Sequence, residues 1–242
     1  MASSPKAPVD GLTTRHIVYL VFMHMIGAMI LDAGINFGIA TAMYKNNSHP
    51  VNLWPLPQTL AGDAGVTIII QQLLTWILDR RAVFGDLKKG MVAPLRMPKN
   101  AGPVLRWFVG LDEAAAGAHC KTFKEKLYFV VSFHGRRIAA IVLATFVLYW
   151  PIAIGILSGL KIHGIGADHS SRGGDFNVWP LPEIFKGVYG AALGLTTPLM
   201  SYVTLIFQGE TQQLNAVSDN DDLAMNSVSD TTATAPLAQS AA

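Results

Sequence analysis

Carboxylate, amide and hydroxyl side chains recur at helical spacing inside two long apolar stretches of the chain. The five residues are Asp32, Asn36, Asp63, Thr67 and Gln71. Asp32 lies close to the midpoint of the apolar run 16–44, and Asn36 follows about one helical turn later. The other three recur every four residues, which places them on one face of a helix. Polar groups in such stretches are typical of proton or ion paths and of hydrogen bonding between helices.

Asp32 is the most informative of these positions. Placing an aspartate at the centre of a bilayer costs roughly 2.5–3.5 kcal/mol on insertion scales, so its side chain should face other helices. No lysine or arginine lies at the same depth, so the carboxyl must be protonated, hydrogen-bonded or matched to a bound cation. Two interpretations stay open: a neutral carboxyl that bonds another helix, and a proton or cation relay.

Other chemistries find little support. Two groups contain potential metal ligands: Met23, His24, Met25 and Met29, and His163, Asp168, His169 and Asp175. The first suits Cu(I), but methionine is also ordinary packing material, and the second matches no metal-binding spacing. The single cysteine, Cys120, excludes a disulfide framework and a cysteine-based zinc site. We identify no catalytic residues, metal site or cofactor, and an enzyme is not the favoured interpretation.

These residues must be positioned by four long apolar runs. Charged residues make up 14% of the chain, against roughly 25% in globular proteins. A helix that crosses a bilayer needs about 20 apolar residues, and the predicted spans are 16–44, 59–78, 138–160 and 187–207. The sequence therefore predicts an all-α membrane protein with four transmembrane helices. A signal peptide is the alternative for the first run, because Ala40-Thr41-Ala42 resembles a cleavage site.

A hexapeptide occurs twice, once in each half of the chain. Asn52-Leu53-Trp54-Pro55-Leu56-Pro57 returns 125 residues later as Asn177-Val178-Trp179-Pro180-Leu181-Pro182. Tryptophan favours the membrane interface, and proline fixes an extended entry to the following helix. The motif is either an interfacial anchor with a helix start, or a paired gate or binding lip.

The repeat predicts two parallel two-helix units, residues 15–78 and 127–207, packed as a pseudo-symmetric pair with Trp54 and Trp179 at one membrane level. Three spans also carry glycines at four-residue spacing, which indicates close helix packing. These pairs are Gly34 and Gly38, Gly155 and Gly159, and Gly190 and Gly194.

The remaining predicted segments are a disordered leader (1–14), a basic loop (79–126) with a short amphipathic helix (103–118), an interfacial helix (121–135) and a disordered acidic tail (208–242). The second span is expected to end at Asp79-Arg80-Arg81. Pro151 should kink the third span.

The basic loop 79–126 sets the expected orientation. It holds ten of the eighteen lysine and arginine residues, so the positive-inside rule places it and both termini in the cytosol. The loop is either solvated or rests on anionic lipid headgroups. The expected partners are the lipid bilayer and, as an open alternative, a second copy of the chain; nucleic acid is not expected.

Two short stretches carry a family resemblance. Leu31-Asp32-Ala33-Gly34-Ile35-Asn36-Phe37-Gly38, together with Trp54-Pro55-Leu56-Pro57 through Ala61-Gly62-Asp63, resembles an uncharacterised fungal family of four-span membrane proteins. The resemblance covers about residues 15–207. It implies an intracellular membrane, with the vacuole as one candidate, and it implies no activity.

Two functional hypotheses follow. The first is a small carrier or channel that passes protons, a cation or a small solute along a bundle lined by Asp32 and the polar stripe of the second span. The second is a structural or accessory membrane subunit without transport activity.

Overall fold

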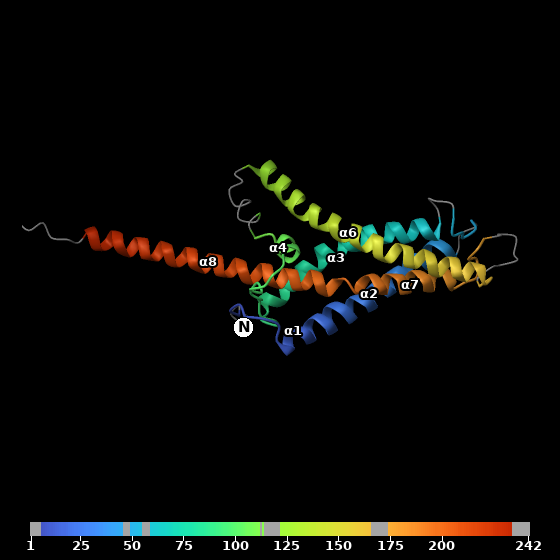
Figure 1. Ribbon diagram of the computed structural model, residues 1–242, viewed down its shortest axis with the longest axis horizontal. Helices are drawn as coiled ribbons and strands as arrows, with labels where there is room; N and C mark the ends of the chain where they lie inside the picture. The colour runs from blue at the N-terminus through green and yellow to red at the C-terminus, as the bar shows by residue number, and fades with distance from the viewer. Residues whose placement is uncertain are drawn as a thin grey trace, which may run out of the picture.

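The computed structural model describes residues 6–45, 49–54, 59–111, 113, 122–165 and 174–233, with side chains as far as residue 217. Within those ranges every regular element is a helix, and four helical segments are long and apolar enough to cross a membrane. These segments, called spans 1 to 4, are Thr14–Lys45, Leu60–Lys88, Phe123–Ile162 and Leu181–Val217. They lie lengthwise beside one another in an elongated bundle (Figure 1). The expected all-helical chain with four apolar helices is confirmed at this level, whereas the repeat arrangement stays a prediction.

Span 1 is a continuous helical segment made of four consecutive elements. They are α1 (Thr14–Val18), η1 (Tyr19–Ile26), α2 (Gly27–Ala40) and η2 (Thr41–Lys45), of which η1 and η2 are π-helical. No proline occurs between Pro8 and Pro50, so nothing in this run removes a helical hydrogen bond.

Span 2 is the helix α3 (Leu60–Lys88), which begins after Thr59, whose hydroxyl accepts a hydrogen bond from Gly62 N. It continues ten residues beyond the expected end at residue 78. Charged residues there do not stop the helix, because Asp79 bonds groups of spans 1 and 4 and Arg80 packs on aromatic rings of α3 itself and of α8. Asp79 is buried and hydrogen-bonded, and the Arg80 guanidinium lies 5.3–5.4 Å from the ring centres of three aromatic residues.

Span 3 is a single helix, α6 (Phe123–Ile162), with Pro151 inside it. The expectation of an interfacial helix over 121–135 and a separate span over 138–160 is therefore wrong. Charged residues often end a membrane helix, but here Arg136 and Arg137 are bound to protein groups and the helix continues through them.

Span 4 is made of α7 (Leu181–Gly194) and the first part of α8 (Thr197–Ala233). A short turn at Leu195 and Thr196 precedes Pro198 and separates the two helices. In Figure 1, α8 extends well beyond the bundle. This corrects the expected disordered tail for residues 208–233. No glycine or proline occurs between Gly209 and Pro236, so no strong helix breaker interrupts that stretch.

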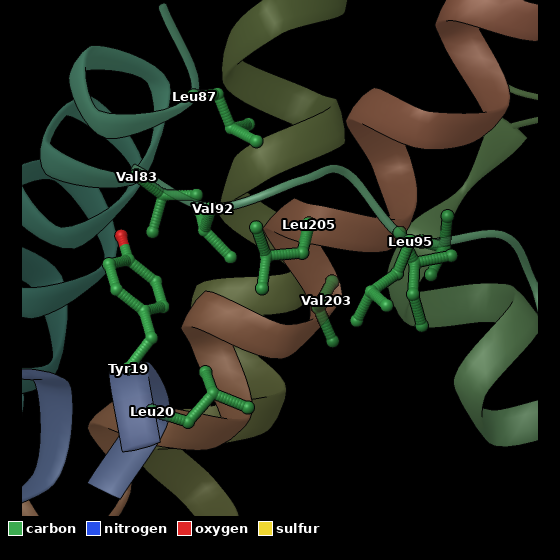
Figure 2. Close-up of a cluster of buried hydrophobic side chains, with 10 residues drawn as sticks. Tyr19, Leu20, Val83, Leu87, Val92, Leu95, Val203 and Leu205 are labelled. Atoms are coloured by element: carbon green, nitrogen blue, oxygen red, sulfur yellow. The ribbon is translucent and has the colours of Figure 1, made fainter. Parts of the chain in front are cut away.

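The leader and the central loop fold onto one end of the bundle, called the central-loop end. Val9 pairs with the loop through hydrogen bonds to Pro94 O and from Arg96 N, so residues 6–13 are not the disordered leader expected. Leu95 N donates to Leu205 O of α8, and Leu95 joins a buried apolar cluster with residues of spans 1, 2 and 4 (Figure 2). This burial of apolar loop residues orders both segments.

The amphipathic helix of the central loop is shorter than expected. The helix α4 (Pro103–Val109) starts with a proline at its first position and ends at Gly110, whose φ of 67° lies in the left-handed region that favours glycine. The expected helix over 103–118 is therefore wrong in its extent, because Gly110 ends its first element.

Close packing between α2 and α7 depends on glycines of span 4. A Cβ added at Gly194 would lie 3.0 Å from Met29 N, and one added at Gly190 would clash with the Asn36 side chain. By contrast, a Cβ would meet nothing within 4 Å at Gly34, Gly38, Gly155 or Gly159. The structure therefore places close contacts at Gly190 and Gly194, and no neighbouring described segment approaches the other four.

Candidate functional site

Three groups of polar side chains lie where spans 1, 2 and 4 meet. We call them the central cluster (Asp32, Asn36 and Gln71), the loop-end cluster (Tyr44, Asp63, Glu183 and Lys186) and the Asp79 cluster (His24, Asp79 and Ser201). Their order follows α3, which contributes Asp63, Gln71 and Asp79 at intervals of eight residues. The loop-end cluster is named after the two hexapeptide loops, next to which it lies, and this is the end of the bundle opposite to the central-loop end. The Asp79 cluster lies towards the central-loop end.

The central cluster joins the predicted polar residues of spans 1 and 2. Gln71 Nε2 donates to Asp32 Oδ2 at 2.8 Å and to Gly190 O at 2.9 Å. Asn36 Nδ2 donates to Gln71 Oε1 at 3.0 Å and to Asp32 O at 2.9 Å. Asn36 and Gln71 are buried, Asp32 is half-buried, and Thr67 is buried one turn before Gln71. The structure thus brings Asp32, Asn36 and Gln71 together, and Asp63 belongs to a different group.

The loop-end cluster contains an ion pair between spans 2 and 4. Lys186 Nζ lies 2.5 Å from Asp63 Oδ1, and the Tyr44 hydroxyl donates to Asp63 Oδ2 at 2.9 Å. Lys186 also lies 3.7 Å from Met43 Sδ. Glu183, one turn before Lys186 on α7, is only 1% exposed. The cluster therefore holds two acidic groups and one basic group away from solvent.

Sequence reasoning did not identify two members of this cluster, Lys186 and Glu183, as functional residues. It assigned Lys186 to the loop before span 4 and did not consider Glu183, because span 4 was expected to start at residue 187. A signal was present in the hexapeptide itself. Since Pro182 suits the first turn of a helix, Glu183 and Lys186 were already placed for the first two turns of α7.

The Asp79 cluster is an imidazole–carboxylate pair with a hydroxyl donor. His24 Nδ1 lies 2.5 Å from Asp79 Oδ1, and Ser201 Oγ is 2.8 and 2.9 Å from the two carboxylate oxygens. All three residues are buried. Because the serine bonds the carboxylate and not the imidazole, this is not the arrangement of a serine nucleophile with its base. The pair can hold and exchange a proton.

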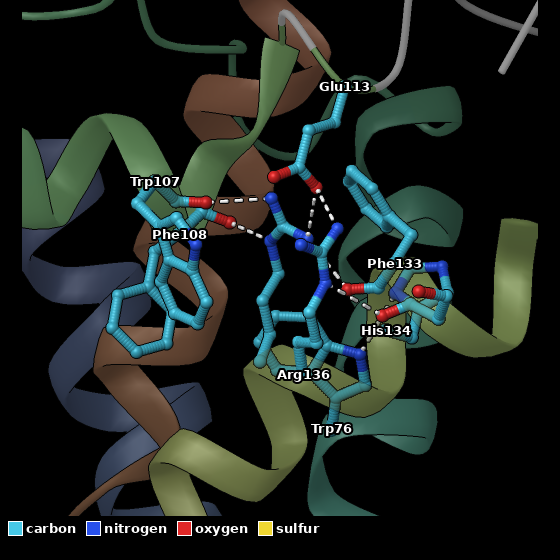
Figure 3. A network of polar contacts seen from close by, with 9 residues as sticks. Trp76, Trp107, Phe108, Glu113, Phe133, His134 and Arg136 are labelled. Carbon is cyan, nitrogen blue, oxygen red and sulfur yellow. Dashed lines mark hydrogen bonds and ion pairs between the residues drawn. The ribbon is translucent and has the colours of Figure 1, made fainter. Parts of the chain in front are cut away.

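A fourth polar network anchors α4 to span 3 at the central-loop end (Figure 3). Arg137 is fully buried, and its guanidinium donates to Phe108 O at 2.9 Å, Trp107 O at 2.7 Å and Phe133 O at 2.6 Å. It also lies 3.3 Å from Glu113, which pairs with the more exposed Arg136 at 3.0 Å. Arg137 thus binds the last carbonyl groups of α4, where helices leave such groups unpaired.

The first asparagine of each hexapeptide bonds a residue just before the other copy, at one end of the bundle. Asn177 Oδ1 accepts from Val51 N at 2.7 Å, Asn52 Oδ1 accepts from Asp175 N at 3.3 Å, and Phe176 N donates to Val51 O at 2.9 Å. Trp54 and Trp179 therefore belong to the same end of the bundle. Pro180 and Pro182 lie at the start of α7, whereas Pro55 and Pro57 fall outside the described residues.

Asp175 connects this hexapeptide contact to span 3. Burial alone would raise the pKa of its carboxyl, but hydrogen bonds from the Lys161 ammonium at 2.8 Å and Leu53 N at 3.2 Å hold the pKa below its ordinary value. Asp175 is thus an ionised group that links Lys161 of span 3 to the first hexapeptide loop. Asp168 and His169 lie outside the described residues, and among the described ones no three histidine, cysteine or acidic side chains gather as metal ligands.

Comparisons with known proteins agree with the family resemblance at a coarse level. Residues 117–205 match a family described as "Protein of unknown function (DUF2456)". The chain is 33% identical over 212 residues to "Uncharacterized protein C594.02c" of Schizosaccharomyces pombe, an alignment that covers 83% of this chain and 40% of that protein. It is 25% identical over 272 residues to "Uncharacterized protein YHL026C" of Saccharomyces cerevisiae, covering 87% of this chain and 85% of the relative. No solved structure matches.

Proposed function

We propose that this chain is a multi-span membrane protein that passes protons along the interface between spans 1, 2 and 4. One observation carries the proposal: the Asp32–Gln71 contact has an acid–base pair on either side, Asp63–Lys186 in one direction and His24–Asp79 in the other. Ionisable groups are rare inside membrane helices and often mark proton relays. Here two of the acidic members, Asp63 and Asp79, lie on the same helix, α3, with Gln71 midway between them.

The donors that surround the carboxylates favour a proton over a metal cation. Asp63 already accepts from Lys186 and Tyr44, and both oxygens of Asp79 lie within hydrogen-bonding distance of Ser201. A cation such as Ca²⁺ takes about 6–8 oxygen ligands and would have to displace these donors. A proton adds to one oxygen and leaves the rest of the network in place.

The spacing of the clusters sets a condition on the relay. Eight residues of α-helix correspond to about 12 Å at 1.5 Å per residue, which is beyond direct transfer between neighbouring clusters. Protons must therefore cross these intervals through side-chain rotation or transient water. Asp32 is the natural intermediate because it is half-buried and lies on the span that faces Gln71.

A structural role is the second candidate, and a specific observation favours it. The contacts at Asp32, Asp63 and Asp79 each connect two different spans. These groups are therefore able to hold the bundle together without having any other role. Hydrogen bonds between membrane helices contribute about 0.6 kcal/mol on average. A subunit built in this way would need no transport activity.

Replacing Asp32 with asparagine separates the two candidates. The amide keeps an acceptor for Gln71 Nε2 but cannot exchange a proton at neutral pH, so we expect proton flux to be lost while the melting temperature stays close to that of the wild type. Flux is measured with the purified chain in liposomes that contain a pH-sensitive dye, under an imposed pH gradient.

Asp10→Asn is the matched control, since this carboxylate is 82% exposed and lies outside the spans. Wild-type flux through Asp32→Asn would contradict the relay. Flux no greater than that of empty liposomes for the wild type would favour the structural role.

The proposed orientation comes from the ten basic residues of the central loop. By the positive-inside rule both termini face the cytosol and the hexapeptides face the lumen of an intracellular membrane, with the vacuole as one candidate. Tags at residues 1 and 242 should both be open to protease from the cytosolic side, and protection of either tag would contradict this topology.

A further inference from the structure

We propose that Glu183 carries an exchangeable proton in the loop-end cluster and that Lys186 pairs alternately with Asp63 and Glu183. This inference rests on the proposed function for its part in transport, but the protonation itself can be measured without any flux. It assigns the uptake of protons at the hexapeptide end to a group other than Asp32.

The first argument is the distribution of hydrogen-bond donors. The Asp63 carboxylate has both of its oxygens paired, one with the Lys186 ammonium and one with the Tyr44 hydroxyl. Glu183 is 1% exposed, and its Oε2 has no hydrogen-bond partner within the described part of the chain. The one ammonium of the cluster therefore neutralises Asp63, and Glu183 has no counter-charge of its own there.

The second argument is energetic. An ionised carboxylate taken from water into a protein interior costs several kcal/mol unless a partner compensates it. A proton removes that charge and turns one oxygen into a donor. In the observed arrangement, the state of lowest cost is thus an ionised Asp63 paired with Lys186 and a neutral Glu183.

The third argument concerns reach. Glu183 and Lys186 are three residues apart on α7, a spacing at which helical side chains are neighbours. Among the described residues, the ionisable groups that interact with this pair are Tyr44 from η2 and Asp63 from α3. If the Glu183 carboxyl gives its proton to Asp63, the proton leaves one carboxyl oxygen and binds another. The Lys186 ammonium then turns to the newly formed Glu183 carboxylate, and the net charge of the cluster does not change.

A competing structural role for Glu183 makes a different prediction. Carboxylates in the first turn of a helix are stabilised by its unpaired N–H groups and by the helix dipole. In that role Glu183 would be ionised, and its replacement with glutamine would lower the melting temperature without removing any protonated carboxyl.

The test is infrared difference spectroscopy of the full chain in liposomes at neutral pH. The C=O stretch of a protonated carboxylic acid is separate from the carboxylate bands, so it reports directly on the neutral group. We expect a band that is lost in Glu183→Gln and retained in Asp32→Asn. It should also be lost in Asp63→Asn, because Lys186 is then free to pair with Glu183. The melting temperature of Glu183→Gln should stay unchanged, since glutamine has nearly the shape of the neutral acid.

Each result decides a separate step. Because a neutral Asp32 would add a band of its own, the diagnostic quantity is the difference from the wild type. Equal carboxylic-acid absorption in the wild type and Glu183→Gln would overturn the protonation of Glu183, and equal absorption in the wild type and Asp63→Asn would overturn the shared ammonium. The expected band pattern in a chain without proton flux would contradict the proton path and support the Glu183 assignment. Proton flux in the wild type, together with a band that is the same in the wild type and Glu183→Gln, would support the proton path and contradict the Glu183 assignment.

Discussion

Replacing Lys186 with methionine should destabilise the protein by about 3–5 kcal/mol, the cost of removing one partner from a buried ion pair. Both side chains of the pair are sheltered, with 6% of Lys186 and 14% of Asp63 exposed. Without the ammonium, the Tyr44 hydroxyl is the one donor to Asp63 that remains in the described part of the chain. The measurement is thermal or denaturant unfolding of the purified chain in detergent micelles.

The double variant Lys186→Met with Asp63→Asn identifies the cause of the loss. Removing both charges of a buried pair is often close to neutral, so the double variant should recover most of the stability lost in Lys186→Met. Lys161→Met is the matched control, because this lysine also pairs with an aspartate but is 50% exposed. It should cost at most about 1 kcal/mol. Equal losses in Lys186→Met and Lys161→Met, or no recovery in the double variant, would contradict a buried pair.

The partner of Asp63 illustrates what the sequence could and could not predict. The length of the apolar runs was enough to predict four helices, and the four-residue spacing of Asp63, Thr67 and Gln71 was enough to place them on one face. The spacing within one helix says nothing about which residues of another helix meet that face. That pairing depends on the packing of α7 against α3, where Ala64 and Ile68 share a buried apolar cluster with Tyr189 and Leu193, and this is a property of the folded bundle.

Charged residues misled the prediction of helix ends for a related reason. Asp79, Arg80, Arg136 and Arg137 looked like boundaries, because charges are costly in an apolar environment. Asp79 and Arg137 are buried with their hydrogen bonds satisfied, and the helices continue through them. A local pattern cannot show that a distant segment, such as α4 or Ser201 of α8, will supply the partners.

The hexapeptide repeat was informative about contacts more than about chemistry. The first asparagine of each copy bonds a residue just before the other copy, so both loops lie at one end of the bundle, whereas the pseudo-symmetric pairing of the two units stays a prediction. The ionisable residues that we place in the proton path come from different positions in the two halves. At the 125-residue spacing of the repeat, Asp63 corresponds to Val188 in the second half. Lys186 corresponds to Ala61 in the first half.

Replacing Arg137 with methionine should cost about 2–6 kcal/mol, because it leaves Trp107 O and Phe108 O without their donor, at about 1–3 kcal/mol for each buried group. The guanidinium also lies 3.8 Å from the ring centre of Phe133 and 5.3 Å from that of Trp107, so stacking is lost as well. We therefore expect α4 to detach from span 3. Unfolding in micelles measures the loss of stability, and Trp107 fluorescence with limited proteolysis of residues 97–111 measures the detachment.

The neighbouring residue offers a matched control for this anchor. Arg136 shares the ion pair with Glu113, but its side chain is 57% exposed. Its guanidinium bonds Ser132 O and Glu113 and no α4 carbonyl among the described residues, so Arg136→Met should change stability by at most about 1 kcal/mol. Arg137→Lys should fail to restore the anchor, because a single ammonium cannot reproduce the planar fork that reaches Trp107 O, Phe108 O and Phe133 O together. If Arg136→Met and Arg137→Met proved equally costly, the anchor would be a matter of net charge. A difference confined to position 137 requires the geometry of the guanidinium, and α4 is then held against span 3 by one residue, Arg137.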